Sequence, residues 1–225
     1  MRYEIQHGPA YALLKVYLEE GESVVAEPGA MVLMRNVDMK TTMPGGFFKS
    51  IMRAALGGES LFVNTFVGKS GGGEVWLAPN VPGDTAYVPL NGEKILIQDN
   101  SYLAHHGDVN VGVEFRGLGG FLSEGDFVWL KAEGEGGVWI NSFGAMETVE
   151  LKEGETVTVD NFHLVAMDSG VRYKMRKVGG LKSVLFGGEG IVVELSGPGR
   201  VVIQTRTVDG LAQTVIPFLP KGEES

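Results

Sequence analysis

Hydrophobic and polar residues alternate with a period of two along much of this chain. The alternation is clearest in three segments that begin with Gly-Glu: GESVVAE from residue 21, GEKILIQ from residue 92 and GETVTVD from residue 154. A period of two places every second side chain on the same face of an extended strand. The pattern therefore predicts three half-buried β-strands, whose apolar faces carry Val24 and Ala26, Ile95 and Ile97, and Val157 and Val159.

Each of these Gly-Glu strands is followed by further matching segments, which predicts an internal repeat. AMVLM at 30–34, YLAHH at 102–106 and HLVAMD at 163–168 come next, and the copies close with GEVWLAP from 73, GGVWINS from 136 and GRVVIQT from 199. We expect three β-rich units of about 3–80, 81–146 and 147–216, with a mobile tail at 217–225. Units this small bury little alone. The predicted fold is therefore all-β: one domain over residues 1–216, a β-sandwich or prism with pseudo-threefold symmetry.

A glycine-rich corner recurs before the last two strands of each unit. LGGES at 56–60 and LFGGEG at 185–190 nearly match, LSEGD at 122–126 is a looser copy, and their glutamates recur at intervals of 65 residues. A phosphate loop would need a helix after its glycines, whereas strand-forming residues follow here. We therefore interpret as structural turns Gly57, Gly58, Glu59, Glu124, Gly187, Gly188 and Glu189.

Composition narrows the classes of function. The absence of cysteine excludes disulfides, thiolate metal sites and a cysteine nucleophile. With 19 Lys and Arg against 28 Asp and Glu, the net charge of -9 opposes binding to a nucleic-acid backbone. The amino-terminal segment does not resemble a signal peptide, and no run of about 18 apolar residues predicts a membrane helix, so we expect a cytoplasmic protein.

Candidate chemistry is sparse, and no cofactor is expected. His106, Asp108 and the repeat-related Asp168 could together hold a divalent metal, although solvated turn residues are the favoured interpretation. His163 should be half-buried and hydrogen-bonded to the backbone, with a ligand site as the alternative. Trp76 and Trp139 occupy matching positions, where packing in the core or at an interface is favoured over a ligand-stacking pair.

The sequence offers no convincing catalytic group. The repeated glutamates Glu59, Glu124 and Glu189 either cap the corners, as we favour, or meet as an acid cluster. The serines in glycine-rich turns, Ser70, Ser142 and Ser196, lack the surroundings of a nucleophile. A non-enzymatic protein is therefore expected.

One segment, residues 43–58, interrupts the repeat. Its apolar residues Phe47, Phe48, Ile51 and Met52 follow helical spacing, with Lys49 left to face water. Three interpretations remain open: packing over an open end of the fold, contact between subunits, or docking onto a membrane surface or hydrophobic partner.

Long motifs carry a family resemblance. GGESLFVNTFVG, GEKILIQDNSYLAH, VDNFHLVAMDSGVRY and the stretch from Lys182 to Arg206 resemble the altered-inheritance-of-mitochondria protein family, over about Tyr3 to Thr207. The resemblance implies a fold similar to that of the tryptophan-dependent RNA-binding attenuation protein. It also implies, from the mitochondrial relative, a role in organising inner-membrane architecture, but no catalytic residues.

These observations favour a binding or scaffold protein that self-associates and presents a surface to a protein or membrane partner. A homo-oligomer is expected, with a trimer as the favoured stoichiometry because threefold units assemble about matching axes. The alternative is a small-molecule or metal-binding protein, catalytic or not, with its site between the repeats.

Overall fold

The computed structural model describes residues 1–42, 63–114, 129–177 and 191–219. The first unit contains β1 (Arg2–Gln6), β2 (Leu13–Leu18), β3 (Ser23–Ala26), β4 (Met31–Arg35), β5 (Val37–Thr42), β6 (Val63–Gly68) and β7 (Gly73–Leu77). The second contains β8 (Thr85–Gln98), the 3-10 helix η1 (Asp99–Ser101), β9 (Tyr102–Glu114) and β10 (Trp129–Asn141). The third contains β11 (Met146–Leu151), β12 (Thr156–Asp160), η2 (Asn161–His163), β13 (Leu164–Asp168), β14 (Arg172–Lys177), β15 (Ile191–Ser196) and β16 (Gly199–Gln204). The prediction of an all-β fold is confirmed.

Strand pairing follows the same scheme in each unit, and every pair of named strands is antiparallel. In the first unit β7 pairs with β2 and β4, while β6 pairs with β3 and β5. In the third, β16 pairs with β11 and β13, while β15 pairs with β12 and β14. The second unit uses long strands, so β10 pairs along its length with both β8 and β9. The predicted threefold rotation among the units is not confirmed.

The units are joined by strand pairs that we call seams. In the first seam β3 pairs with β9, and in the second β8 pairs with β13. Each seam thus joins the Gly-Glu strand of one unit to the strand of the next unit that carries a β-bulge. We call these the bulged strands: β4, residues 102–106 of β9, and β13, whose registers shift at Val32, Leu103 and Val165.

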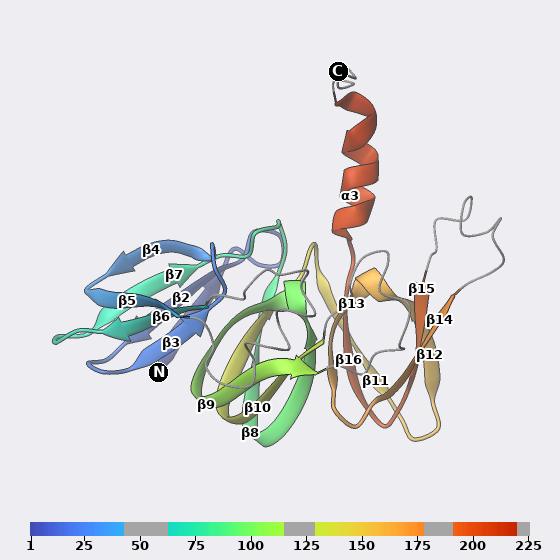
Figure 1. The fold of residues 1–225 in the computed structure, drawn as a ribbon, viewed down its shortest axis with the longest axis horizontal. Coiled ribbons are helices and arrows are strands. Elements are labelled where there is room, and N and C mark those ends of the chain that lie inside the picture. The colour runs from blue at the N-terminus through green and yellow to red at the C-terminus, as the bar shows by residue number, and fades with distance from the viewer. Residues whose placement is uncertain (43–62, 115–128, 178–190, 220–225) are drawn as a thin grey trace.

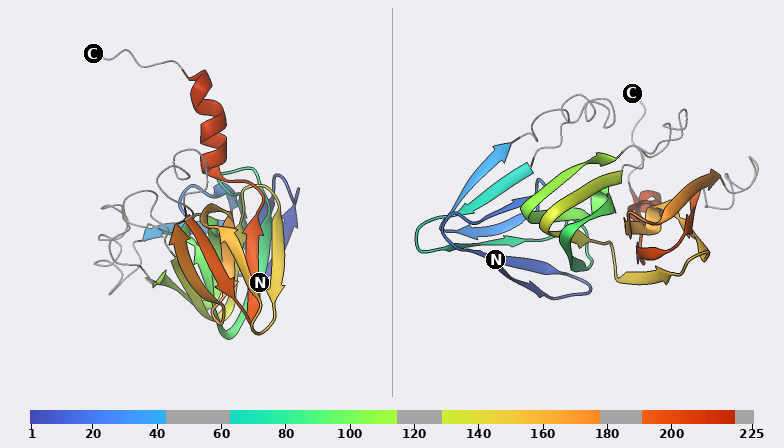
Figure 2. Two further views of the ribbon diagram at one scale, coloured as in Figure 1. Left: turned by 90° about the vertical axis from the view of Figure 1, so that its right-hand side faces the viewer. Right: turned by 90° about the horizontal axis from the view of Figure 1, so that it is seen from below.

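The seams connect nine strands into one sheet, in the order β11-β16-β13-β8-β10-β9-β3-β6-β5, flanked by the sheets β1-β2-β7-β4 and β12-β15-β14. Figure 1 shows the three units in a row, with the first unit in blue at the left and the third in orange at the right. The view from below in Figure 2 shows the same row. The units therefore follow one another in chain order, with β4 and β12 in the two end units.

The core is divided along the same row. Three clusters of buried hydrophobic residues are centred on Phe66 and Trp139, on Ile97 and Ile140, and on Leu164 and Leu195. The first cluster includes Leu103, Ala104 and Trp139 from the second unit, so the first unit completes its core only with its neighbour. Such sharing is expected of units too small to bury their own apolar faces.

The chain ends in a helix rather than a strand. α3 (Val208–Val215) and the 3-10 helix η3 (Ile216–Phe218) follow β16, and Thr207 caps α3 by accepting a hydrogen bond from the backbone N–H of Gly210. Figures 1 and 2 show α3 standing away from the strands. The expectation that the third unit is β-rich up to residue 216 is therefore wrong for its end. Across the described residues, none of the helices has the length and apolar character required to span a bilayer.

Candidate functional site

Several side chains that the sequence singles out lie outside the described residues. They are the contact candidates Phe47, Phe48, Ile51 and Met52 and the corner residues Gly57, Gly58, Glu59, Glu124, Gly187, Gly188 and Glu189. The predictions for these residues stay predictions. The site is therefore built from the two seams and the strand edges that the structure describes.

The three candidate metal ligands do not converge. His106 lies in the first seam, where its Nε2 is 2.9 Å from the hydroxyl oxygen of Tyr87. Asp168 lies in the second seam, where its carboxylate accepts three hydrogen bonds from Arg200. Asp108 is exposed. Among the described residues no three His, Asp or Glu side chains are grouped to hold a metal ion, so this hypothesis for the three residues is wrong.

An aromatic cluster fills the first seam. The ring of Tyr87 on β8 lies 4.9 Å from Tyr3, 5.3 Å from Trp139 and 5.8 Å from His106, measured between centroids. Gly137 makes this packing possible, because a Cβ at that position would meet the Tyr87 ring. Trp139 is fully buried, so the core interpretation is confirmed for this residue.

Trp76 has different surroundings from Trp139. It is half-buried on β7, its indole N–H donates to Glu74 over 3.1 Å, and the Lys15 ammonium lies 4.1 Å from its ring centroid. β7 and β10 belong to different sheets. The two tryptophans therefore occupy separate environments, and the predicted alternative of a ligand-stacking pair is wrong.

Charged groups surround His106 at the edge of the cluster. Glu22 forms an ion pair of 3.2 Å with the amino group of Met1, and a hydrogen bond from the Glu19 N–H lowers the pKa of Glu22. Burial lowers the pKa of His106, and the nearby amino group lowers it further, against the opposing effect of Glu22. His106 is therefore neutral at neutral pH and exchanges a hydrogen bond with Tyr87.

A second group of titratable side chains lies on the other face of the same seam. The Tyr102 hydroxyl oxygen is 2.7 Å from His105 Nδ1 and 3.3 Å from the Val25 carbonyl, to which it donates. Burial lowers the pKa of His105 to about 4 and raises that of Tyr102. Glu27 follows β3, its N–H donates to the Leu103 carbonyl, and burial raises its pKa to about 8. These groups are uncharged at neutral pH, apart from a fraction of Glu27.

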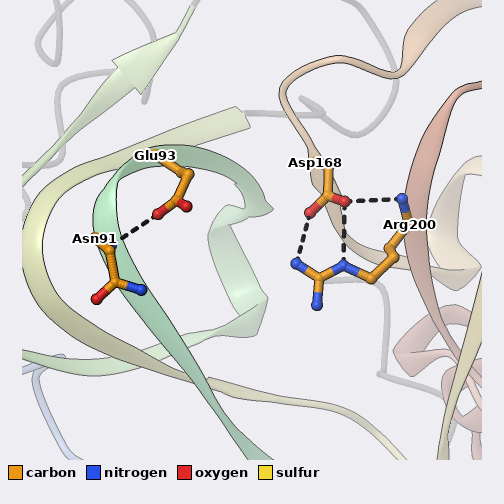
Figure 3. Close-up of polar contacts among 4 residues, drawn as sticks. All are labelled: Asn91, Glu93, Asp168 and Arg200. Atoms are coloured by element: carbon orange, nitrogen blue, oxygen red, sulfur yellow. Dashed lines mark hydrogen bonds and ion pairs between the residues drawn. The ribbon is translucent and has the colours of Figure 1, made fainter.

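The second seam carries exposed charges in place of aromatic rings. Figure 3 shows Asp168 bound by Arg200 through two side-chain hydrogen bonds of 3.1 Å and a backbone bond of 2.9 Å. The bond with Asp168 is the main reason that the pKa of Arg200 is raised, and Glu93 contributes from the neighbouring unit. Glu93 itself accepts a hydrogen bond from the Asn91 N–H. The glutamate of the Gly-Glu strand thus acts across the seam on the bulged strand's ion pair.

Two other sequence candidates have structural partners. The Nδ1 of His163 lies 2.6 Å from the Gln204 carbonyl oxygen, and the side chain is half-buried, as predicted. Ser142 is buried and donates to the Gly144 carbonyl over 2.7 Å. Ser142 is therefore part of a turn, with its hydroxyl already engaged.

Exposed apolar side chains are grouped on two elements of the described residues. On β4, Met31, Val32 and Met34 are 38%, 57% and 43% exposed. On the C-terminal helical segment, the exposed apolar side chains are Val208, Leu211, Val215, Ile216, Phe218 and Leu219. Single exposed apolar residues are ordinary on a protein surface, whereas grouped ones indicate a contact.

Sequence reasoning missed both the contact between Tyr87 and His106 and the raised pKa of Glu27. Tyr87 and His106 are 19 residues apart and meet only because β8 and β9 both pair with β10. In the sequence Glu27 is an ordinary acidic residue before a Pro-Gly turn, and nothing there indicates a raised pKa. Sequence reasoning also missed the exposure of β4. The segment AMVLM has no polar residue, and this was the available signal.

Comparisons with known proteins match a family model and two streptococcal proteins. The family model described as mitochondrial biogenesis AIM24 matches residues 3–206. An uncharacterized protein of Streptococcus pyogenes serotype M6 is 31% identical over 229 residues, which covers 98% of this chain and 92% of the relative. A crystal structure of a Streptococcus pyogenes protein is similar with a TM-score of 0.81 and 29% identity, and covers 97% of this chain and 99% of that one.

Proposed function

Since this chain belongs to the family described as mitochondrial biogenesis AIM24, we propose that it is a self-associating scaffold without catalytic activity that presents a surface to a partner. The observation that carries the proposal is the row of exposed apolar side chains on β4, namely Met31, Val32 and Met34. Among the described residues β4 pairs with β7 alone, and an edge strand of this kind is a template for pairing with another chain. Self-association is the simplest way to cover it.

The internal use of the reactive side chains supports a role other than catalysis. His106 is engaged by Tyr87, Asp168 by Arg200, and Ser142 by a backbone carbonyl. A catalytic nucleophile or base must lie within hydrogen-bond reach of a position that a substrate can occupy. These groups instead contact neighbouring groups within the seams and turns.

The C-terminal helix supports the second part of the proposal, the surface for a partner. Val208, Leu211 and Val215 follow the spacing of one helical face, and none of the residues of α3 is buried. Polar residues such as Asp209 and Gln213 occupy the rest of the helix and bond to each other over 2.6 Å. An amphipathic helix with an uncovered apolar face suits a groove on a protein or the surface of a membrane.

Light scattering coupled to size-exclusion chromatography tests self-association. Across a dilution series the wild-type protein should elute with a mass above that of one chain, which is 24.1 kDa. A monomer at every concentration would contradict the scaffold proposal.

Flotation with anionic vesicles and protein pull-down test the helix. The variant Leu211→Ser with Val215→Ser should lose whichever interaction the wild type makes, while Gln213→Ser, on the polar face, should keep it. An interaction that survives in the double variant would place the partner surface elsewhere.

A small-molecule function is the second candidate, and the first seam favours it. Glu27, with a pKa raised to about 8, lies near Tyr102 and His105 in a largely buried setting of the kind found at binding sites. Thermal unfolding against a panel of metabolites tests this function. A ligand at about 100 times its Kd should stabilise the fold by about 2.7 kcal/mol, whereas a scaffold should show no shift.

A further inference from the structure

The two seams join the units in the same register. In the first seam Val24, Val25 and Ala26 pair with His106, His105 and Ala104. In the second, Ile95, Leu96 and Ile97 pair with Asp168, Met167 and Ala166. Both therefore place the last residue of the Gly-Glu strand's apolar face opposite an alanine that follows the bulge. The same antiparallel register therefore occurs in both seams.

The third bulged strand, β4, has the same internal geometry but lacks this partner. Its register with β7 shifts between Met31 and Leu33, as the register of β13 with β16 shifts between Leu164 and Ala166. Through β7 and β16, Leu33, Met34 and Arg35 correspond to Ala166, Met167 and Asp168. Among the described residues, β4 pairs with β7 alone.

Burial shows what the missing pairing would cover. The bulge residues Leu103 and Val165 are both fully buried, while their counterpart Val32 is 57% exposed. Met167 is 1% exposed and its counterpart Met34 is 43% exposed. Apolar residues at the first unit's edge are thus exposed at the positions that a preceding Gly-Glu strand covers in the other two units.

The complementary edge lies at the other end of the row. β12, the Gly-Glu strand of the third unit, pairs with β15 alone among the described residues. Val157 and Val159 are half-buried, whereas the equivalent Val24 and Ala26 are fully buried in the first seam. Figure 1 shows β12 in the unit at the right and β4 in the unit at the left, so the two edges do not meet within one chain.

The charged residues near the seams support the same pairing of β12 with β4. In the first seam Glu22 acts on His106, and in the second Glu93 acts on the Asp168–Arg200 pair. All three Gly-Glu glutamates accept a hydrogen bond from the turn before them, as Glu155 does from the Lys152 N–H. On β4 the exposed Arg35, 3.1 Å from Glu74, occupies the position that would face Glu155.

We propose that β12 of one molecule pairs antiparallel with β4 of a second copy and forms a third seam, with Val159 opposite Leu33, Thr158 opposite Met34 and Val157 opposite Arg35. The inference rests on the proposed self-association and names its interface. The contact is head-to-tail, so each copy uses β12 toward one neighbour and β4 toward the other. Such a contact builds a ring if its rotation closes and a filament if it does not.

Proline at two positions can block each edge separately. The Glu27 N–H donates across the first seam to Leu103, so the Val25 N–H, two residues earlier, points across the same seam toward His105. Thr158 and Met34 are the counterparts of Val25 and His105. Thr158→Pro and Met34→Pro therefore remove outward-facing amides, where an edge strand tolerates proline. Thr158→Ser and Met34→Leu keep the amides and serve as matched controls.

Mixing the two variants is the decisive experiment. Met34→Pro alone and Thr158→Pro alone should each be monomeric by light scattering, since each retains only one kind of edge, while the controls should assemble like the wild type. Mixed together, the two variants should form a heterodimer, because the intact β12 of the first can pair with the intact β4 of the second. Native mass spectrometry identifies that species, and circular dichroism checks that each variant is folded.

Cysteine pairing tests the register without proline. The chain contains no cysteine, and directly opposite residues that do not exchange hydrogen bonds lie at a separation suited to a disulfide. A mixture of Leu33→Cys and Val159→Cys should give a mixed disulfide under mild oxidation, at least about tenfold more than Leu33→Cys with the exposed Glu153→Cys.

The outcomes separate this inference from the function on which it rests. A wild-type protein that is monomeric at every concentration would overturn both. A wild-type oligomer that survives either proline change, or a folded variant pair that does not combine, would overturn the β4–β12 seam while leaving self-association intact. A mixed disulfide no more abundant than in the control pair would also overturn it.

Discussion

The raised pKa of Glu27 predicts how stability changes with pH. Burial raises this pKa from 4.5 to about 8, so the folded chain holds a proton that the unfolded chain releases at neutral pH. The group's contribution to stability is fully present below pH 4.5 and is lost as pH rises through 8. Glu27 should therefore make the protein less stable at pH 8 than at pH 6.5.

His105 changes stability with pH in the opposite direction to Glu27 and over a lower pH range. Its pKa is lowered from 6.5 to about 4 by burial, so its contribution is present above pH 6.5 and is lost as pH falls through 4. The interval between pH 6.5 and 8 therefore isolates Glu27 from His105. One extra proton bound by the folded state lowers the free energy of unfolding by about 1.4 kcal/mol for each pH unit in that interval.

Urea denaturation followed by tryptophan fluorescence at several pH values measures this slope. Glu27→Gln, which removes the titration and keeps the shape of the side chain, should abolish the decline between pH 6.5 and 8. The exposed Glu20→Gln is the matched control and should keep it. A decline that persists in Glu27→Gln, or a wild-type protein without one, would refute the assignment.

Three further changes probe the seams. Gly137→Val should lower the free energy of unfolding by about 1–3 kcal/mol, because its side chain would displace the Tyr87 ring. Gly170→Ala is the control, since its added Cβ meets only an ordinary contact. Denaturation midpoints in the reverse order would contradict the packing described. Trp139→Ala, in the core, should cost about 3–5 kcal/mol, and Trp76→Ala, which is half-buried, should cost less; equal losses in thermal unfolding would argue against the difference in their surroundings. Asp168→Asn should change stability by less than about 1 kcal/mol, because its ion pair with Arg200 is exposed; a larger loss in urea denaturation would mean that the pair holds the second seam.

Much of the strand content could be predicted from the sequence, because alternation reports directly which side chains face a core. β3 and β12 lie within segments that alternation marked, and β13 lies within a segment that the repeat marked. The bulge at Leu103 could not be predicted, since Tyr102, Leu103 and Ala104 are all buried and show no alternation whose phase the extra residue could shift. The helix from Val208 was also missed, because the repeat was extended past its last strand.

The site was harder to predict than the fold. Local sequence showed that His106 and Asp168 correspond, but each finds its partner, Tyr87 or Arg200, through pairing across the sheet. The pKa of Glu27 depends on how deeply its carboxyl group is buried from solvent, and no local sequence pattern predicts that burial. Burial and long-range pairing are therefore the information that the alternation lacks.

The register that the two seams share also bears on how the chain folds. Each observed seam pairs a Gly-Glu strand with a bulged strand, and the residue after the bulge is alanine in both, Ala104 in β9 and Ala166 in β13. During refolding β3 can therefore pair with β13 and leave the second unit excluded, a trapped state with native-like strand content. Synthesis from the amino terminus avoids this competition, since β9 emerges and pairs with β3 before β13 exists. The protein should thus fold more faithfully as it is made than when diluted from denaturant.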